Sequence, residues 1–309
     1  MTTAGARLRR AWSSRPIMIP GAFNALAARM AERIGFQAVY FSGGALSAGW
    51  AGVPDIGLLT LTEFVEQAAV IARSTRLPLL CDADTGFGEA INVERTTRLF
   101  EEAGVGGIHL EDQVLPKRCG HLLGKTLIEP EAMAEKIRAA ISARRDASFV
   151  IVARTDARSV EGFDAAVERG RLYAEAGADL IFPEALESAA EFAEYAALVP
   201  GLKLANMTEF GRGPLLDFDE LAALGYRAVI YPLTAFRAAM KAAEDTLAVL
   251  SATGSQREML NRMLTRTQLY DLIEYRDATT GVGSILTTNE RGAKTLAEDD
   301  SGDKTNRHN

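Results

Sequence analysis

Polar and ionisable residues follow short apolar runs at six places along the chain, at the point where each run ends. In order, they are Ser42-Gly43-Gly44, Asp82 and Asp84, Glu111 and Asp112, Arg154 and Asp156, Glu184, and Asn206 and Thr208. If the apolar runs are parallel strands of a barrel, their carboxyl ends meet on one face, where barrel enzymes hold their reacting groups. We therefore expect these side chains to share one site.

Carboxylates dominate this set. Asp82 and Asp84 lie two residues apart, so on a strand their side chains point to the same side. Adding Glu111 and Glu184 gives a group with no obvious His or Cys partner, which favours Mg²⁺, with Mn²⁺ as a substitute, over Zn²⁺. Because Mg²⁺ retains several waters, some of these carboxylates would bind it through water. For either aspartate alone, helix capping is an equally good interpretation.

A second candidate is the loop PKRCGHLLGK after the fourth apolar run, residues 116–125. Cys119 lies close to Lys117 and His121, and nearby cations lower the pKa of a thiol. A thiol that titrates near neutral pH can transfer protons. On the pattern alone, an inert loop cysteine is the better interpretation. Cys81 lies inside an apolar run and is expected in the core.

Three arginines from different segments are candidates for binding an anionic substrate. Arg154 directly follows an apolar run, and its planar guanidinium suits a carboxylate. The alternative for Arg154 is an ion pair with Asp156 or Glu184. For Arg237 and Arg266, surface exposure is the simpler interpretation.

The elements that would position these residues are eight short apolar runs. They are IMIP from Ile17, AVYF from Ala38, LPLL from Leu77, GIHL from Gly107, FVIV from Phe149, DLIF from Asp179, LKLA from Leu202 and AVIY from Ala228. Most are separated by segments of helical periodicity, and Gly35, Gly104, Gly177 and Gly225 each follow such a segment, as helix-ending glycines do. The pattern predicts an α/β fold, a (β/α)₈ TIM-type barrel, with a doubly wound sheet as the alternative.

The 309-residue length fits one such barrel. We expect a single barrel domain over residues 1–285, in which residues 256–275 form an additional helix on the same barrel or on a partner subunit. Residues 286–309 are polar and are predicted to be a disordered tail.

Composition excludes several classes of function. The net charge of −7 and a pI of about 5.2 argue against a nucleic-acid partner, which needs a basic face. Two cysteines are too few for a secreted disulfide scaffold, and no apolar stretch approaches the roughly 20 residues of a membrane span. We expect a soluble cytoplasmic protein without a membrane partner.

Taken together, these segments resemble a known family. KRCGH resembles the signature loop of isocitrate lyases, and YFSGG, GVPDIG, LCDADTGFG, HLEDQ, VIVARTDA, LIFPEA, NMTEFG and YPLTAFRA follow the order seen in 2-methylisocitrate lyases, up to about Tyr275. The resemblance places the chain in the isocitrate lyase/phosphoenolpyruvate mutase superfamily. It implies a Mg²⁺-dependent barrel that cleaves 2-methylisocitrate, a tricarboxylate, into pyruvate and succinate in the methylcitrate cycle of propionate catabolism. It also implies a homotetramer whose subunits exchange a helix.

The resemblance assigns roles to individual residues. Asp82, Asp84 and Glu184 match metal-site positions, with Glu111 nearby. The positions that match substrate contacts are Ser42, Gly43, Gly44, Cys119, Gly120, Arg154, Asn206, Thr208, Arg237 and Arg266. By the same likeness, His121 and arginine would hold the succinate carboxylates and Cys119 would protonate the carbanion. Asp55 and Tyr40 are both candidates for the base.

Related activities remain as alternatives. Phosphoenolpyruvate mutases and phosphonopyruvate hydrolases lack the KRCGH loop, and isocitrate lyases are usually longer. 2,3-Dimethylmalate lyases and oxaloacetate hydrolases, which use dicarboxylates, are harder to separate. Phe182, Ile230 and Pro232 match positions around the substrate methyl group, and Ile230 stands where leucine is expected. A non-catalytic barrel scaffold is the remote alternative, although none of the matched functional residues is missing.

Overall fold

The structure, a computed structural model, describes residues 2–120, 122 and 124–275. Eight parallel strands form one sheet in the order β1-β8-β7-β6-β5-β4-β3-β2. They are β1 (Ile17–Pro20), β2 (Val39–Phe41), β3 (Leu79–Asp82), β4 (Gly107–Glu111), β5 (Val150–Thr155), β6 (Leu180–Pro183), β7 (Leu202–Asn206) and β8 (Tyr226–Tyr231). The two outermost strands in this order meet through a parallel bridge between Gly21 and Tyr40. The barrel is therefore nearly closed, which confirms the (β/α)₈ prediction over the open doubly wound sheet.

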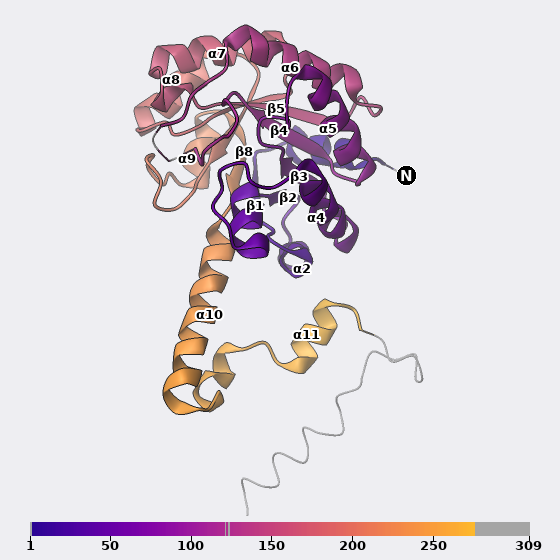
Figure 1. Ribbon diagram of the computed structural model, residues 1–309, viewed down its shortest axis with the longest axis vertical. Coiled ribbons are helices and arrows are strands. Elements are labelled where there is room, and N and C mark those ends of the chain that lie inside the picture. The colour runs from indigo at the N-terminus through magenta and orange to yellow at the C-terminus, as the bar shows by residue number, and fades with distance from the viewer. Residues whose placement is uncertain (1, 121, 123, 276–309) are drawn as a thin grey trace, which may run out of the picture. The chain divides into compact units, whose positions relative to one another are not determined.

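Helices alternate with the strands, and those from α2 to α9 surround the barrel (Figure 1). The helices are α2 (Ala25–Ile34), α4 (Leu61–Ser74), α5 (Ala90–Glu102), α6 (Pro130–Ala143), α7 (Phe163–Glu175), α8 (Ala189–Leu198), α9 (Phe218–Ala223) and α10 (Thr234–Thr253). A short helix α3 (Gly43–Leu46), a π-helical turn η1 (Ser47–Ala51) and a 3₁₀ turn η2 (Ala157–Ser159) complete the loops after β2 and β5. The four predicted helix-ending glycines all have positive φ, between 85° and 101°, which confirms their role.

The barrel interior is filled by alternate residues of the strands. Ile17 and Ile19 of β1, Leu80 of β3, and matching residues of the other strands form one buried cluster. Leu8 and Trp12 belong to the same cluster and come from α1 (Ala4–Ser13), which contacts β3, β4 and β5. A second, larger cluster fills the layer between the strands and the outer helices.

The same period of two brings the polar residues to the mouth of the barrel. Side chains two residues apart on a strand point to the same side. The residue two positions after the last one that fills the interior therefore also points inward, and it lies at the carboxyl end of the strand. On β5 this step runs from Val152 to Arg154, and on β6 from Phe182 to Glu184. The equivalent residues on the other strands are Ser42, Asp82, Glu111 and Asn206.

Residue contacts divide the chain into two compact units, Met1–Ala248 and Val249–Asn309. In the second unit, the predicted helical segment forms a 3₁₀ turn η3 (Arg257–Arg262) and the helix α11 (Arg266–Leu272). The predicted tail, residues 286–309, lies outside the described residues, and the single domain over residues 1–285 stays a prediction. Within the described part of the chain, no helix has the length and apolar character of a membrane span.

Candidate active site

Asp82 and Asp84 connect the carboxyl ends of β2, β3 and β4 through hydrogen bonds. Oδ2 of Asp82 accepts a hydrogen bond from the backbone of Gly43 at 3.0 Å, and Oδ1 accepts one from the backbone of Asp84 at 3.0 Å. Asp84 has a left-handed backbone with φ of 45°, and its carbonyl accepts the N–H of Glu111 at 2.9 Å. A positive φ is uncommon for residues other than glycine, although aspartate adopts it more readily than most.

Lys117 is a functional candidate whose place in the site the sequence did not reveal. Its side chain is 3% exposed, and Nζ lies 2.8 Å from Oδ1 of Asp84 and 2.5 Å from Oδ1 of Asp55. The sequence singled out this lysine only as a cation near Cys119. No local signal distinguishes a lysine that turns into the site from one that faces solvent.

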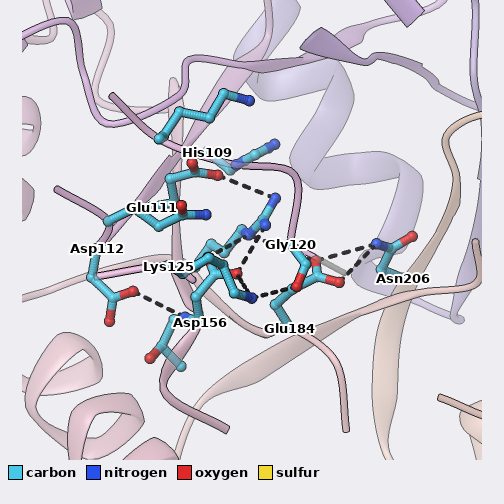
Figure 2. A network of polar contacts seen from close by, with 12 residues as sticks. His109, Glu111, Asp112, Gly120, Lys125, Asp156, Glu184 and Asn206 are labelled. Atoms are coloured by element: carbon cyan, nitrogen blue, oxygen red, sulfur yellow. Dashed lines mark hydrogen bonds and ion pairs between the residues drawn. The ribbon is translucent and has the colours of Figure 1, made fainter. Parts of the chain in front are cut away.

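Arg154 contacts three carboxylates at the mouth of the barrel, and Figure 2 shows these partners, Glu111, Asp156 and Glu184. Nη1 lies 3.2 Å from Oε2 of Glu111, and Nε lies 3.0 Å from Oδ2 of Asp156 and 3.6 Å from Oε2 of Glu184. Asn206 donates from Nδ2 to Oε2 of Glu184 at 3.2 Å. The ion pairs that were the alternative reading of Arg154 are therefore present, within a site that also has the geometry to bind a carboxylate.

The loop that carries Cys119 packs directly against this arginine. A Cβ added to Gly120 would collide with the Arg154 guanidinium and lie 2.6 Å from Cγ of Glu184. Lys125 fixes the loop, since Nζ donates to Oδ1 of Asp156 at 2.7 Å and to the carbonyl of Gly120. Cys119 itself is half-buried. His121 lies outside the described residues.

Burial shifts the pKa values of the strand-end groups. It raises the pKa of Asp84 to about 7, although the positive charge of Lys117 opposes the shift. Burial also raises the pKa of Glu111 well above its usual range, with Arg154 acting against it. For His109, burial lowers the pKa to about 4, which makes the imidazole neutral near pH 7. The mouth thus holds carboxyl groups whose ionised form needs a nearby positive charge.

The strand-end carboxylates offer oxygen donors to a divalent cation. Neither carboxylate oxygen of Glu111 makes a hydrogen bond, although Oε2 faces Arg154, and a buried carboxylate of this kind is costly without a cation or a proton. Among the described residues, no three His, Cys, Asp or Glu side chains converge into a ready-made metal site. Mg²⁺ in enzymes is commonly held by one or two carboxylates and several waters. The oxygen-only donors at Asp84 and Glu111 fit that mode.

The remaining predicted residues lie either at the mouth of the barrel or deeper in the protein. Ser42 and Thr208 lie buried at the mouth, and a Cβ on Gly44 would lie 3.4 Å from Oδ2 of Asp55. Tyr40 lies deeper, where its hydroxyl is 2.7 Å from Nε2 of His109, and burial raises its pKa well above the usual range. Asp55 contacts Lys117, whereas Tyr40 is a buried phenol, and the identity of the base stays a prediction.

Arg237 and Arg266 are the two remaining arginines that the sequence assigns to the substrate. Arg237 on α10 lies 3.2 Å from Oε2 of Glu209, with its guanidinium carbon 5.4 Å from the ring centre of Phe210. Arg266 is exposed at the start of α11, in the second unit. Their substrate contacts stay predictions.

A nearly closed barrel of eight parallel strands, with buried acids, a lysine and an arginine at the strands' carboxyl ends, defines an enzyme of the (β/α)₈ class. Residues 8–250 match the phosphoenolpyruvate phosphomutase family. The chain belongs to this family, within the phosphoenolpyruvate mutase/isocitrate lyase superfamily.

Proteins of similar sequence indicate which class of reaction within this superfamily the chain catalyses. The chain is 54% identical over 274 residues to a 2-methylisocitrate lyase of Aeropyrum pernix, covering 88% of each chain. It is 45% identical to a 2,3-dimethylmalate lyase of Eubacterium barkeri, covering 88% of this chain and 94% of the relative. With such relatives, the chain is a lyase.

Solved structures agree with this fold. A 2,3-dimethylmalate lyase superposes with a TM-score of 0.83 at 32% identity, covering 99% of this chain and 100% of that one. A phosphonopyruvate hydrolase in complex with oxalate and Mg²⁺ superposes with a TM-score of 0.80 at 32% identity, covering 96% of this chain and 99% of that one.

Proposed function

We propose that this lyase cleaves 2-methylisocitrate into pyruvate and succinate, in the methylcitrate cycle of propionate catabolism. The observation that carries the proposal is the packing of Gly120 against Arg154 and Glu184. This packing places the thiol-bearing residue, Cys119, beside the arginine best suited to hold a substrate carboxylate. The 54% identity to the Aeropyrum pernix 2-methylisocitrate lyase supports the choice of substrate.

Mg²⁺ is the proposed cofactor, with Mn²⁺ as a substitute. Asp82, Asp84 and Glu184, with Glu111 nearby, would hold it, some of them through water. When bound, Mg²⁺ would stabilise negative charge on the substrate hydroxyl and polarise the adjacent carboxylate. Support comes from the carboxylate oxygens of Glu111, which are buried without a hydrogen bond, and from the related hydrolase structure that contains Mg²⁺ and oxalate.

The protein's own groups would carry the proton transfers. Asp55 would accept the proton of the substrate hydroxyl as the C–C bond breaks and the pyruvate carbonyl forms. The bonding electron pair stays on the succinate carbon, and the thiol of Cys119 would donate a proton to that carbon. Solvent then restores both groups. Lys117 would orient Asp55, because its Nζ lies 2.5 Å from Oδ1 of that carboxylate.

Arg154 would bind one substrate carboxylate by exchanging part of its contact with Glu111 and Glu184 for the ligand. Burial strengthens such charge-assisted hydrogen bonds, because little water competes for them. His121, whose neighbour Gly120 packs on Arg154, is proposed to hold a second carboxylate. Ser42, Gly43, Asn206 and Thr208 would complete the polar wall.

The second candidate activity is cleavage of 2,3-dimethylmalate. It is favoured by the Eubacterium barkeri relative at 45% identity. That substrate would leave part of the polar wall without a partner, because it carries one carboxylate fewer than 2-methylisocitrate. A site built to bind a charged group discriminates strongly against a ligand that lacks it. The positions assigned to the substrate methyl, Phe182 and Ile230, are fully buried and apolar, which suits either substrate.

The decisive experiment measures product release by the purified protein, with and without EDTA. Pyruvate is followed from 2-methylisocitrate and from 2,3-dimethylmalate, glyoxylate from isocitrate, and oxalate from oxaloacetate. We expect 2-methylisocitrate to be preferred by about a hundredfold in kcat/KM, or about 2.7 kcal/mol in transition-state binding. EDTA should abolish the activity and added Mg²⁺ restore it. A preference for another substrate would overturn the proposed reaction but not the lyase class.

We also propose a cytoplasmic homotetramer in which the C-terminal helices pack on a partner subunit. Helix α10 has no buried residue along its 20 residues. Its exposed residues include the apolar side chains of Met240, Leu247 and Leu250. Exposed apolar side chains grouped on one element are typical of association surfaces. Light scattering after size-exclusion chromatography should give four times the 33.3 kDa chain mass, and a monomer mass would contradict the proposal.

A further inference from the structure

A buried hydrogen-bond network lies behind the active site, in the layer between the barrel and α7. Its centre is Asp112, the residue after β4, which is fully buried. Oδ2 of Asp112 accepts a hydrogen bond from the hydroxyl of Tyr173 at 2.8 Å and lies 3.3 Å from Nη1 of Arg169. Tyr173 and Arg169 are neighbouring residues on one face of α7, spaced i, i+4. None of these three side chains belongs to the proposed catalytic set.

The other oxygen of Asp112 points toward the site. Oδ1 accepts the backbone N–H of Asp156 at 2.9 Å, as Figure 2 shows. Asp156 in turn binds two cations: Arg154 donates to its two oxygens at 3.0 and 3.1 Å, and Lys125 donates to Oδ1 at 2.7 Å. A continuous path of hydrogen bonds therefore runs from α7 to the substrate-binding arginine.

Arg169 also joins the two ends of the Cys119 loop. Besides Asp112, at the start of the loop, Nη1 donates to the carbonyl of Ile128 at 2.9 Å, at its end. Glu161 holds the guanidinium from the opposite side through two hydrogen bonds of 2.8 Å. The backbone of Ile128 donates to the carbonyl of Asp112 at 2.9 Å, so the loop base is closed by side chain and main chain together.

We propose that Tyr173 and Arg169 are positioning residues, which fix Asp112 so that Asp156 orients Arg154 and holds Lys125 against the backbone of Gly120. This role differs from ordinary core packing, because it depends on specific hydrogen bonds. Each acceptor in the path receives its hydrogen bond from the next residue of the path. In a buried network of this kind, the loss of one donor is transmitted to its neighbours.

The chain supplies a matched control for this proposal. Tyr226 is, like Tyr173, a fully buried tyrosine of the outer layer, but its hydroxyl donates to the carbonyl of Phe192 at 3.2 Å, away from the site. Tyr173→Phe and Tyr226→Phe remove the same hydroxyl from similar surroundings. A difference between the two variants therefore reports the path to Asp156 rather than the general cost of losing a hydroxyl.

The experiment measures how fast iodoacetamide alkylates Cys119 in the full-length protein, read by peptide mass spectrometry. Cys119 adjoins Gly120, which Lys125 holds, whereas Cys81 is fully buried and serves as an internal reference. In Tyr173→Phe we expect alkylation of Cys119 to rise by about threefold to tenfold, the range that losing one hydrogen bond allows. Tyr226→Phe should match the wild type, and urea unfolding should show similar stability for both variants.

Kinetics supply a second readout. KM for 2-methylisocitrate should rise in Tyr173→Phe by a similar factor, with a smaller change in kcat, and should not change in Tyr226→Phe. This kinetic measurement rests on the proposed function, whereas the alkylation measurement does not depend on any substrate. Equal alkylation rates in the two variants would overturn the positioning role. Absence of wild-type turnover would overturn the proposed function alone.

Discussion

Nζ of Lys117 lies 2.8 Å from Oδ1 of Asp84, and both side chains are almost completely buried. This ion pair links the Cys119 loop to the loop after β3, and the second contact of Lys117, with Asp55, extends it to the loop that follows β2. The lysine therefore occupies the position where a metal ion would also be attracted. Lysine and Mg²⁺ should compensate the same buried carboxylates.

The variant Lys117→Met tests whether Lys117 and Mg²⁺ compensate the same buried carboxylates. Removing one partner of a buried ion pair leaves an uncompensated charge and costs about 3 kcal/mol in the free energy of unfolding. We expect that loss in EDTA and a much smaller loss at saturating Mg²⁺, since the divalent cation supplies the missing charge. Urea unfolding in the two buffers measures both values.

A matched control is Lys136→Met. Lys136 is similarly buried, but it donates to the carbonyl of Thr85 at 3.1 Å instead of to a carboxylate. Its loss of stability should therefore not depend on Mg²⁺. If Lys117→Met loses the same stability in both buffers, the cation does not bind near Asp84.

Asp84→Asn should change how stability depends on pH. Burial raises the pKa of Asp84 to about 7 in the folded protein, against about 4 in the unfolded chain. Between these values the folded state binds more protons, so ionisation of Asp84 lowers stability as the pH rises from about 4 to 7. In EDTA, the wild type should lose roughly 2.6 kcal/mol relative to Asp84→Asn between pH 5 and 8.

Urea unfolding at the two pH values checks this prediction, and Mg²⁺ provides its control. A bound cation favours the ionised carboxylate, so saturating Mg²⁺ should remove or reverse the relative loss. Parallel pH profiles for wild type and variant in EDTA would contradict the raised pKa of Asp84.

The strands and most of the mouth could be predicted because both follow from local patterns. Apolar runs such as FVIV and DLIF coincide with β5 and β6, and the period of two carries the pattern on to Arg154 and Glu184. Gly35 ends α2 with φ of 101°, as a helix followed by glycine predicts. Short-range sequence rules were sufficient for these features.

The contacts between loops could not be predicted in this way. Lys117 and Lys125 differ from surface lysines only through carboxylates that are distant in the sequence, at Asp84 and Asp156. A buried ion pair depends on which loops meet in three dimensions, and no periodicity encodes that meeting. For the same reason, the network from Tyr173 to Asp156 had no signature in the sequence.

Gly120→Ala tests how closely the loop must approach the arginine. The added methyl would collide with the Arg154 guanidinium and lie 2.6 Å from Cγ of Glu184, so one of these groups must move. Misplacement of a catalytic group by about 1 Å can cost about a hundredfold in rate. We expect a loss of that size in kcat/KM, with little change in the melting temperature.

Thr126→Ala is the control for this loop, because Thr126 is exposed and its side chain has no contact in the described network. It should retain wild-type kinetics. Full activity in Gly120→Ala would mean that the loop sits farther from Arg154 during turnover.

Cys119→Ser tests the proton donor. A hydroxyl has nearly the same size as a thiol but a much higher pKa, so the serine should protonate a carbanion poorly. General acid catalysis typically contributes between about 10²-fold and 10⁴-fold to a rate, and we expect kcat for pyruvate release to fall by that factor. Mg²⁺ binding, followed by calorimetry, and the urea midpoint should not change, because Cys119 is half-buried in a loop. Cys81→Ser, in the core, should instead lower stability and leave kcat within a few-fold. Near-normal turnover by Cys119→Ser would assign the proton donor to another group or to water, and the role of the KRCGH loop would then be confined to binding.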